Sequence, residues 1–265
     1  MYWCGGLVEL RFVSVSKEYD GRVAVKKFDM NVSGGEIVAL VGPNGSGKTT
    51  LMRIAIGILK PSMGDVIVNG YSITRSPIEA KRNMGFVPDE PYVYESLSGY
   101  ENIRFIADLW GVNILAKREE LIRLAQILEM GAALDDIVST YSAGMKRKLS
   151  FIMALIHDPK VLIIDEITSS LDPKTLATIE LILTGLKKRG VAILFSTHIL
   201  EVAEVISDRI VIIHKGQKIW EGKSSEIRES TSEDKRLKDI FFELTGGPEY
   251  DLIMEYLKIR EKKWE

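Results

Sequence analysis

The chain has 265 residues and a mass of 29.7 kDa, which is enough to bury a sizeable core in one or two domains. Its 35 basic and 37 acidic residues leave a net charge of −2, which argues against a dedicated nucleic-acid coat and a polybasic membrane surface. The single cysteine, Cys4, excludes an internal disulfide and suits a reducing compartment. No segment approaches the roughly 20 apolar residues that cross a bilayer, and we expect no signal peptide over residues 1–6.

The first part of the chain is expected to be rich in β-strand. Over residues 8–41 apolar and polar residues alternate, with a change of phase at Val13 and Val15. Residues 37–41 form a continuous apolar run, which is typical of a strand buried on both faces of a mostly parallel sheet. A glycine-rich turn follows, and the pattern then predicts a helix over about 48–59.

The middle of the chain has a different pattern. Between about residues 92 and 158 the apolar residues recur at helical spacing, which predicts an insert of three or more helices. Strands on both sides of this insert, alternating with helices, predict an α/β core. The strands are expected at 65–69, 84–87, 161–164, 191–195, 210–213 and 218–220. A helix is expected after Pro173. Beyond residue 222, two short amphipathic pieces are expected at 241–244 and 252–259.

The turn after residues 37–41 has the pattern of a phosphate-binding loop: Gly, four residues, Gly, Lys and Thr. Glycines let backbone N–H groups turn towards phosphate oxygens, and the helix N-terminus adds partial positive charge. Lys48 is expected to reach the β- and γ-phosphates, Thr49 to ligate Mg²⁺, and Thr50 to bond the α-phosphate. The other loop residues expected at the nucleotide are Gly42, Asn44, Gly45, Ser46 and Gly47.

Two acidic residues end the predicted strand over 161–164. Next to a phosphate loop, Asp165 is the expected partner of the magnesium shell. Glu166 is the candidate to polarise the attacking water, because hydrolysis of a γ-phosphate needs a positioned water more than a covalent group.

With these motifs in place, the chain resembles the nucleotide-binding subunits of ATP-binding-cassette transporters over about residues 8–222. Residues 141–145 are similar to the family signature, and residues 169–172 to the loop that communicates between subunits. His198 follows a strand where the family has its switch histidine, and Tyr19 stands where an aromatic ring stacks on adenine. All these motifs occur in the family's order.

The resemblance implies a fold, a reaction and cofactors. The implied fold is a P-loop NTPase core of the α/β class with an N-terminal antiparallel β subdomain and an inserted all-helical subdomain. We expect residues 1–225 to form the ATPase domain, with the insert at about 92–158, and residues 226–265 to form a C-terminal helical extension. The implied activity is hydrolysis of ATP with Mg²⁺, in which Glu166 and His198 are catalytic.

The sequence departs from the family pattern at two motifs. Asp89 stands where the family usually has glutamine, and we expect it to ligate Mg²⁺ together with Thr49 and Asp165. The signature carries Tyr141, Ala143 and Met145 in place of leucine, glycine and glutamine. It keeps Ser142 and Gly144, which are expected to contact the γ-phosphate bound by a partner subunit.

The resemblance also implies partners. Two such subunits enclose two ATP molecules, and the dimer drives a separate multispan permease at the cytoplasmic face of the cell membrane. Several segments resemble the exporter-type branch, which exports drugs, sodium or polysaccharide, and residues 92–100 are expected beside a groove that receives a permease helix. No nucleic acid is expected. Two alternatives stay open: a soluble ATPase acting on nucleic acid or ribosomes, and a weakly hydrolysing, nucleotide-sensing regulatory subunit.

Overall fold

The computed structural model describes residues 8–166, 168, 171–229 and 237–246. One sheet is antiparallel and has the strand order β2-β1-β4-β5. Its strands are β1 (Val8–Tyr19), β2 (Arg22–Ser33), β4 (Met63–Val68) and β5 (Tyr71–Ser72). The expected change of phase corresponds to a register shift between Phe12 and Val15, where Ser14 has a φ of 47°. This bulge lets Phe12 and Val15 both face the core, with exposures of 1% and 0%.

The second sheet has six strands in the order β10-β9-β3-β8-β7-β6. All neighbours are parallel except β10, which pairs with β9 in the antiparallel sense. All five residues of β3 are buried, as predicted for a strand covered on both faces. The strands are β3 (Ile37–Val41), β6 (Met84–Val87), β7 (Val161–Ile164), β8 (Ala192–Thr197), β9 (Arg209–His214) and β10 (Gln217–Lys223).

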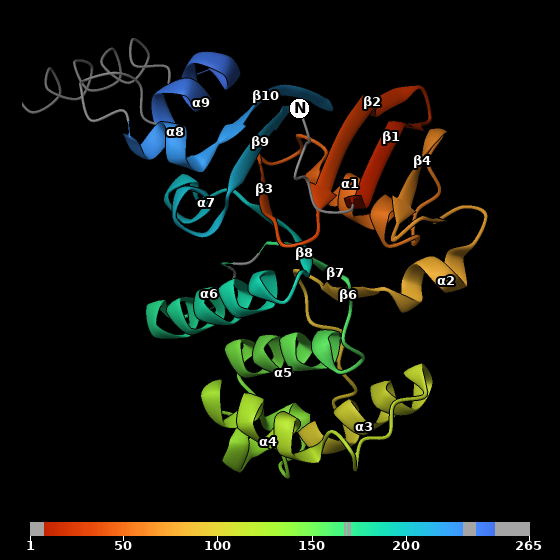
Figure 1. Cartoon of the computed structure of the whole chain (residues 1–265), viewed down its shortest axis with the longest axis vertical. Coiled ribbons are helices and arrows are strands. Elements are labelled where there is room, and N and C mark those ends of the chain that lie inside the picture. Colours follow the sequence, from red (N-terminus) through yellow and green to blue (C-terminus); the bar gives the residue numbers. More distant parts are fainter. Residues whose placement is uncertain (1–7, 167, 169–170, 230–236, 247–265) are drawn as a thin grey trace, which may run out of the picture.

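Three α-helices make up the predicted insert, and two short 3-10 turns at 131–133 and 138–140 lie between the second and the third. The helices are α3 (Gly99–Trp110), α4 (Arg118–Ile127) and α5 (Ala143–Leu155). In Figure 1 these helices and the antiparallel sheet lie at opposite ends of the molecule. The fold is therefore the expected mixed α/β architecture, with a helical insertion between β6 and β7.

Helix α3 begins at a reciprocal cap that the sequence carries as Ser98 and Glu101. The Glu101 N–H donates to Ser98 Oγ at 3.1 Å, and the Ser98 N–H donates to Glu101 Oε2 at 2.8 Å. Both bonds satisfy N–H groups that have no partner within the helix.

Replacing Ser98 by Ala removes one half of this cap. We expect the free energy of unfolding, measured in urea, to fall by about 1 kcal/mol. Ser139→Ala changes an exposed serine of the same insert and is the matched control. Equal stability of the two variants would contradict a stabilising cap.

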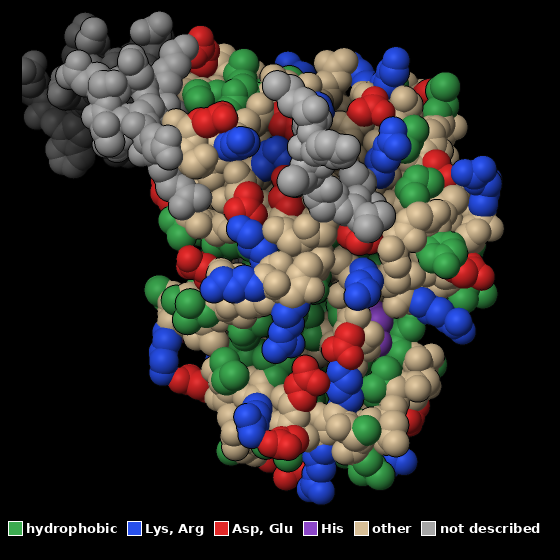
Figure 2. Space-filling view, in the orientation of Figure 1, with side chains coloured by type: hydrophobic (Ala, Val, Ile, Leu, Met, Phe, Trp, Pro, Cys, Tyr) green, Lys and Arg blue, Asp and Glu red, His purple; other side chains and the backbone are tan. Residues whose placement is uncertain are grey.

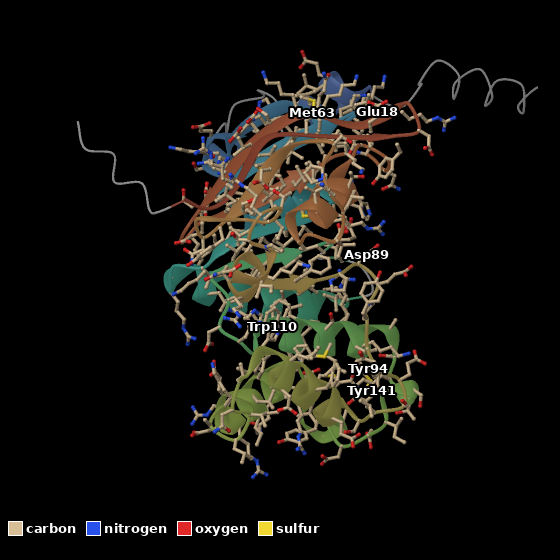
Figure 3. All side chains as sticks on the ribbon, turned by 90° about the vertical axis from the view of Figure 1, so that its right-hand side faces the viewer. Glu18, Met63, Asp89, Tyr94, Trp110 and Tyr141 are labelled. Atoms are coloured by element: carbon tan, nitrogen blue, oxygen red, sulfur yellow. The ribbon has the colours of Figure 1, made fainter. Side chains whose placement is uncertain are left out.

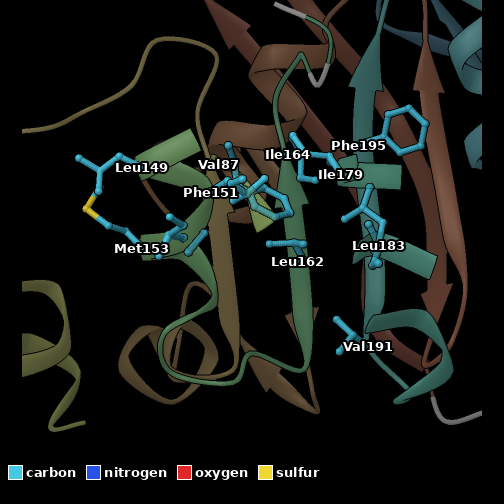
Figure 4. Close-up of a cluster of buried hydrophobic side chains, with 14 of the residues drawn as sticks. Val87, Leu149, Phe151, Met153, Leu162, Ile164, Ile179, Leu183, Val191 and Phe195 are labelled. Carbon is cyan, nitrogen blue, oxygen red and sulfur yellow. The ribbon is translucent and has the colours of Figure 1, made fainter. Parts of the chain in front are cut away.

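The central sheet separates two hydrophobic clusters. Val38 and Leu40 face the antiparallel sheet and α1 (Lys48–Ala55). Ile37, Ala39 and Val41 face the cluster formed with α5, α6 (Pro173–Lys188) and α7 (Leu200–Ile206). Figure 4 shows part of this second cluster, including Val87, Leu149, Phe151, Leu162, Ile164, Ile179, Leu183 and Phe195.

Helix α1 is shorter than the sequence predicts. The helix ends at Ala55 instead of Leu59, because Gly57 adopts the left-handed conformation with a φ of 67°. The N–H groups of Gly57 and Ile58 donate to the carbonyls of Ile54 and Arg53, at 3.0 Å each, and close the helix end. The remaining short helix of this half is α2 (Pro77–Arg82).

The C-terminal segment contributes α8 (Ser224–Glu229) and α9 (Leu237–Thr245). The predicted piece at 241–244 lies in α9, which contacts α7. Leu237, at the start of α9, is fully buried in the cluster that contains Ala203 and Ile206 of α7. The piece at 252–259 lies outside the described residues. The expected boundary between residues 225 and 226 falls inside α8.

A groove of about 850 Å³ separates the insert from the core, between α4, the end of α5 and α6. Hydrophobic side chains gather over these elements in a hollow of the face shown in Figure 2. Within the ranges that the structure describes, no helix has the length and apolar character needed to span a membrane.

Candidate nucleotide-binding and hydrolysis site

The sheet order brings four predicted motifs to one edge. Strands β3, β8, β7 and β6 are parallel neighbours, so their carboxyl ends lie side by side. The register pairs Val41 with Thr197, Ile164 with Phe195 and Val87 with Ile164. The residues that follow these strand ends are therefore neighbours. They are the loop 42–49, His198, the pair Asp165 and Glu166, and Asp89.

At two positions of the loop after β3, no residue larger than glycine fits. Gly47 precedes α1 with a φ of 111°, and a Cβ there would lie 2.9 Å from the carbonyl oxygen of Ala24. A Cβ on Gly42 would lie 2.3 Å from the carbonyl oxygen of Ile213. These contacts explain why the loop pattern requires glycine at both positions.

Lys48 lies folded back over this loop. Its Nζ donates to the carbonyl oxygens of Gly42 at 2.6 Å and Pro43 at 3.2 Å. Burial lowers the pKa of Lys48, and the charges of Glu166 and Asp165 partly offset that effect. Lys48, which follows β3, is thus close enough to interact electrostatically with both carboxylates that follow β7.

The loop fits a phosphate group. Ser46 Oγ is buried and has no hydrogen-bond partner among the described residues. Helix α1 begins without a side-chain cap, so its first N–H groups have no side-chain acceptor there. A buried orphan hydroxyl and uncapped amides beside a lysine are the donors that an anion would satisfy.

Asp165 and Glu166 share one serine of β8. Ser196 Oγ donates to Asp165 Oδ1 at 2.7 Å and accepts from the Glu166 N–H at 2.8 Å. Burial raises the pKa of Asp165, and the Ser196 hydrogen bond opposes that shift. The sequence analysis assigned no role to Ser196. Its position two residues before His198, on the strand next to β7, was the signal that could have identified it.

The carboxylate of Glu166 is held by polar neighbours. Thr168 Oγ1 donates to its Oε1 at 2.8 Å, and Thr197 Oγ1 lies 3.4 Å from the same atom. His198 Nδ1 lies 3.1 Å from Oε2. Glu166 has a φ of 54°, which costs a non-glycine residue about 1 kcal/mol or more. Its backbone is therefore kept in place by its surroundings.

Arg147 of α5 was missed by sequence reasoning. Its side chain is buried, and the guanidinium donates to the carbonyl oxygens of Asp89, Asp165 and Glu166. Burial lowers the pKa of Arg147, while the nearby carboxylates oppose the shift. Because Arg147 stands between Lys146 and Lys148, nothing in the sequence indicates that its side chain is the one that is buried.

The signature residues lie apart from the phosphate loop. Ser142 is the N-cap of α5, where its Oγ accepts from the Met145 N–H at 3.2 Å. Tyr141 is buried inside the insert and donates its hydroxyl to the carbonyl oxygen of Ala133. Figure 3 shows Tyr141 among the insert helices and Asp89 nearer the central sheet. Ser142 and Gly144 therefore lie where α5 begins, next to the buried Tyr141.

Tyr19 ends β1 at the hairpin with β2 and is 42% exposed. Lys17 Nζ lies 5.0 Å from its ring centroid. The hairpin lies close to the phosphate loop, because Ala24 of β2 approaches Gly47. The ring is therefore accessible near the loop, on a separate element. His157, by contrast, stacks on Trp110 with ring centroids 4.5 Å apart, away from these motifs in the helical insert.

Comparison with known proteins agrees with this arrangement. Residues 25–169 match the family described as ABC transporter. Residues 137–204 also match a family described as AAA domain, putative AbiEii toxin, Type IV TA system. The chain is 37% identical over 212 residues to the uncharacterized ABC transporter ATP-binding protein YhcH of Bacillus subtilis (strain 168), which covers 79% of this chain and 68% of that protein.

A second relative and a solved structure match this chain over most of their own length. The chain is 32% identical over 212 residues to the lantibiotic transport ATP-binding protein SrtF of Streptococcus pyogenes, covering 80% of this chain and 90% of that protein. A solved ATP-binding subunit of an ABC transporter is 30% identical, with a TM-score of 0.83 over 89% of this chain and 99% of that one. The chain therefore belongs to the ABC transporter family, among its ATP-binding proteins.

Proposed function

We propose that this chain binds and hydrolyses ATP as one subunit of a pair, and so powers transport through a separate membrane permease. One observation carries this function: the strand order gathers a buried lysine, two carboxylates and a histidine at one sheet edge. A lysine and backbone amides are suited to hold a triphosphate, and a carboxylate held near them is suited to orient the attacking water.

In this function the loop residues bind the nucleotide. Lys48 would exchange its bonds to the loop carbonyls for the β- and γ-phosphates, and Ser46 would bond a phosphate oxygen. Tyr19 would stack on the adenine. The oxygen donors expected around Mg²⁺ are Thr49, Asp89 and Asp165, a set that suits a hard cation completed by phosphate oxygens. When bound, the ion neutralises charge on the phosphates.

Glu166 and His198 would act on the water and the γ-phosphate. With Oε1 held by threonine hydroxyls, Glu166 keeps Oε2 directed at His198. A water beside this pair would donate to the Glu166 carboxylate and leave a lone pair for the phosphorus. His198 is 57% exposed at its side chain, so its ring can turn to donate to the γ-phosphate.

The half-site of one chain is incomplete. Ser142 and Gly144 lie at the start of α5, away from the loop of their own chain, so a second subunit would supply them. Ser142 Oγ and the first amides of α5 form a helix N-terminus suited to a phosphate. ATP would then bind between two subunits, and hydrolysis would release them.

The membrane partner would dock beside the insert. Tyr92 and Tyr94 are 71% and 53% exposed in the segment between β6 and α3, a suitable surface for a permease helix at the cytoplasmic side of the membrane. SrtF is named for lantibiotic transport, which supports a transport role. Residues 1–225 would form the ATPase domain, and residues 226–265 an extension whose start falls inside α8.

Phosphate release by the purified chain tests this function. We expect release that requires Mg²⁺ and a rate per subunit that rises with protein concentration, because each site needs residues of two chains. Binding of ATP without turnover at any concentration, with or without permease-containing membranes, would contradict the hydrolytic role. That result would favour the nucleotide-sensing alternative, to which Asp89 and Ala143 already point.

A further inference from the structure

Arg147 is a buried arginine that has no assigned role in the proposed hydrolysis. Only 3% of the residue is exposed. Burying a guanidinium takes up to five N–H donors out of water, which is costly unless other acceptors replace the water. The acceptors around Arg147 therefore indicate what the side chain does.

These acceptors belong to two loops of the site. Nη1 donates to the carbonyl oxygen of Asp89 at 2.5 Å, in the loop after β6. Nη2 donates to the carbonyl oxygens of Asp165, at 3.0 Å, and Glu166, after β7. One side chain of the helical insert thus ties together the backbone that carries three acidic residues.

Arg147 provides one of two hydrogen bonds that hold the backbone of Glu166. The N–H of Glu166 donates to Ser196 Oγ at 2.8 Å, and its carbonyl accepts from Arg147. Both sides of a residue with a φ of 54° are therefore held. The direction of the Glu166 side chain follows from this backbone, because φ sets where Cβ points.

The charge of Arg147 has a second consequence. Nη1 lies 3.6 Å from Asp89 Oδ1, and the Arg147 charge also interacts with Glu166 and Asp165. The charge of Lys48 also interacts with Glu166 and Asp165. Without Arg147, the carboxylate of Asp89 would stand without this compensating charge beside the phosphates, where it would repel the nucleotide.

We propose that Arg147 is a positioning residue with two separable roles. Its planar set of donors holds the backbone of Glu166 in the geometry that orients water, and its positive charge offsets Asp89 beside the triphosphate. Arg147 lies on the helix that Ser142 caps, so a movement of α5 when two subunits close would reach Glu166 through it. This role rests on the proposed function, which supplies the triphosphate and the second subunit.

Two substitutions separate the roles in the full-length chain. Arg147→Lys keeps the charge and loses the planar donors, so we expect kcat to fall about tenfold or more. Its affinity for a fluorescent ATP analogue in EDTA should stay within about twofold of the parent. Arg147→Gln loses both features, so we expect the same fall in kcat and an affinity in EDTA about fivefold weaker.

A double variant tests the charge pairing. Adding Asp89→Asn to Arg147→Gln removes the carboxylate that faces Arg147 in the parent, so affinity in EDTA should return to within about twofold of the parent. The turnover should stay low, because the donors are still missing. Lys148→Gln removes a positive charge from the same helical turn and is the control for net charge.

Hydrogen exchange gives a readout that does not depend on turnover. The Glu166 amide should exchange faster in both Arg147 variants, with little change in the rest of the β-sheet core. Parent-like kcat and exchange in Arg147→Lys would overturn the positioning role, even if Arg147→Gln does not fold. Failure of Asp89→Asn to restore affinity would overturn the charge role. Absence of turnover in the parent and in Lys148→Gln would instead contradict the proposed ATPase function.

Discussion

Glu166→Gln is expected to lower phosphate release by about 100- to 10,000-fold while ATP binding is retained. The amide keeps the size of the side chain and its contacts with the threonine hydroxyls, but it is a much weaker acceptor for a proton of water. Nucleotide binding depends on the loop after β3, a different element. The two properties should therefore separate in one variant.

The same variant should accumulate a closed dimer. If hydrolysis reopens the paired subunits, a chain that binds ATP and does not cleave it stays paired. Size-exclusion chromatography with Mg²⁺ and ATP should then show a dimer for Glu166→Gln and a mostly monomeric parent. Glu201→Gln, which changes an exposed carboxylate on α7, is the control. Unchanged phosphate release in Glu166→Gln would remove this residue from its proposed role.

Lys48→Ala is expected to weaken ATP binding about 10- to 100-fold, because a charge-assisted hydrogen bond to phosphate is lost. The affinity can be measured by titration of a fluorescent ATP analogue. Turnover at low ATP should fall with it, whereas Glu166→Gln lowers turnover at every ATP concentration.

Stability distinguishes this effect from misfolding. Burial lowers the pKa of Lys48, which means that its charged form is less favourable in the folded protein than in the unfolded chain. Removing the charge should therefore not destabilise the ligand-free fold through electrostatics. Lys60→Ala, at an exposed lysine beyond α1, is the control. An ATP affinity of Lys48→Ala equal to that of Lys60→Ala would contradict the phosphate-binding role of the loop.

Several features of this protein follow from its sequence alone. The phosphate loop is recognisable because its chemistry is local: glycines, a lysine and a helix start lie within one short segment. The apolar run over 37–41 identified a strand buried on both faces, and helical spacing identified the insert. The end of α1 was missed, because the left-handed turn at Gly57 outweighs the apolar spacing that continues to Leu59.

Other features were decided by the tertiary structure. The strand order β3-β8-β7-β6 is not the order of the chain, and it brings the strand ends that precede Lys48, Glu166 and Asp89 to one edge of the sheet. Tyr141, which departs from the family signature, is accommodated inside the insert, where its hydroxyl donates to the carbonyl oxygen of Ala133. Arg147 is one of three consecutive basic residues, and nothing local shows which of them turns inward. The fold selects it, because a buried guanidinium is stable only where backbone carbonyls from distant segments converge.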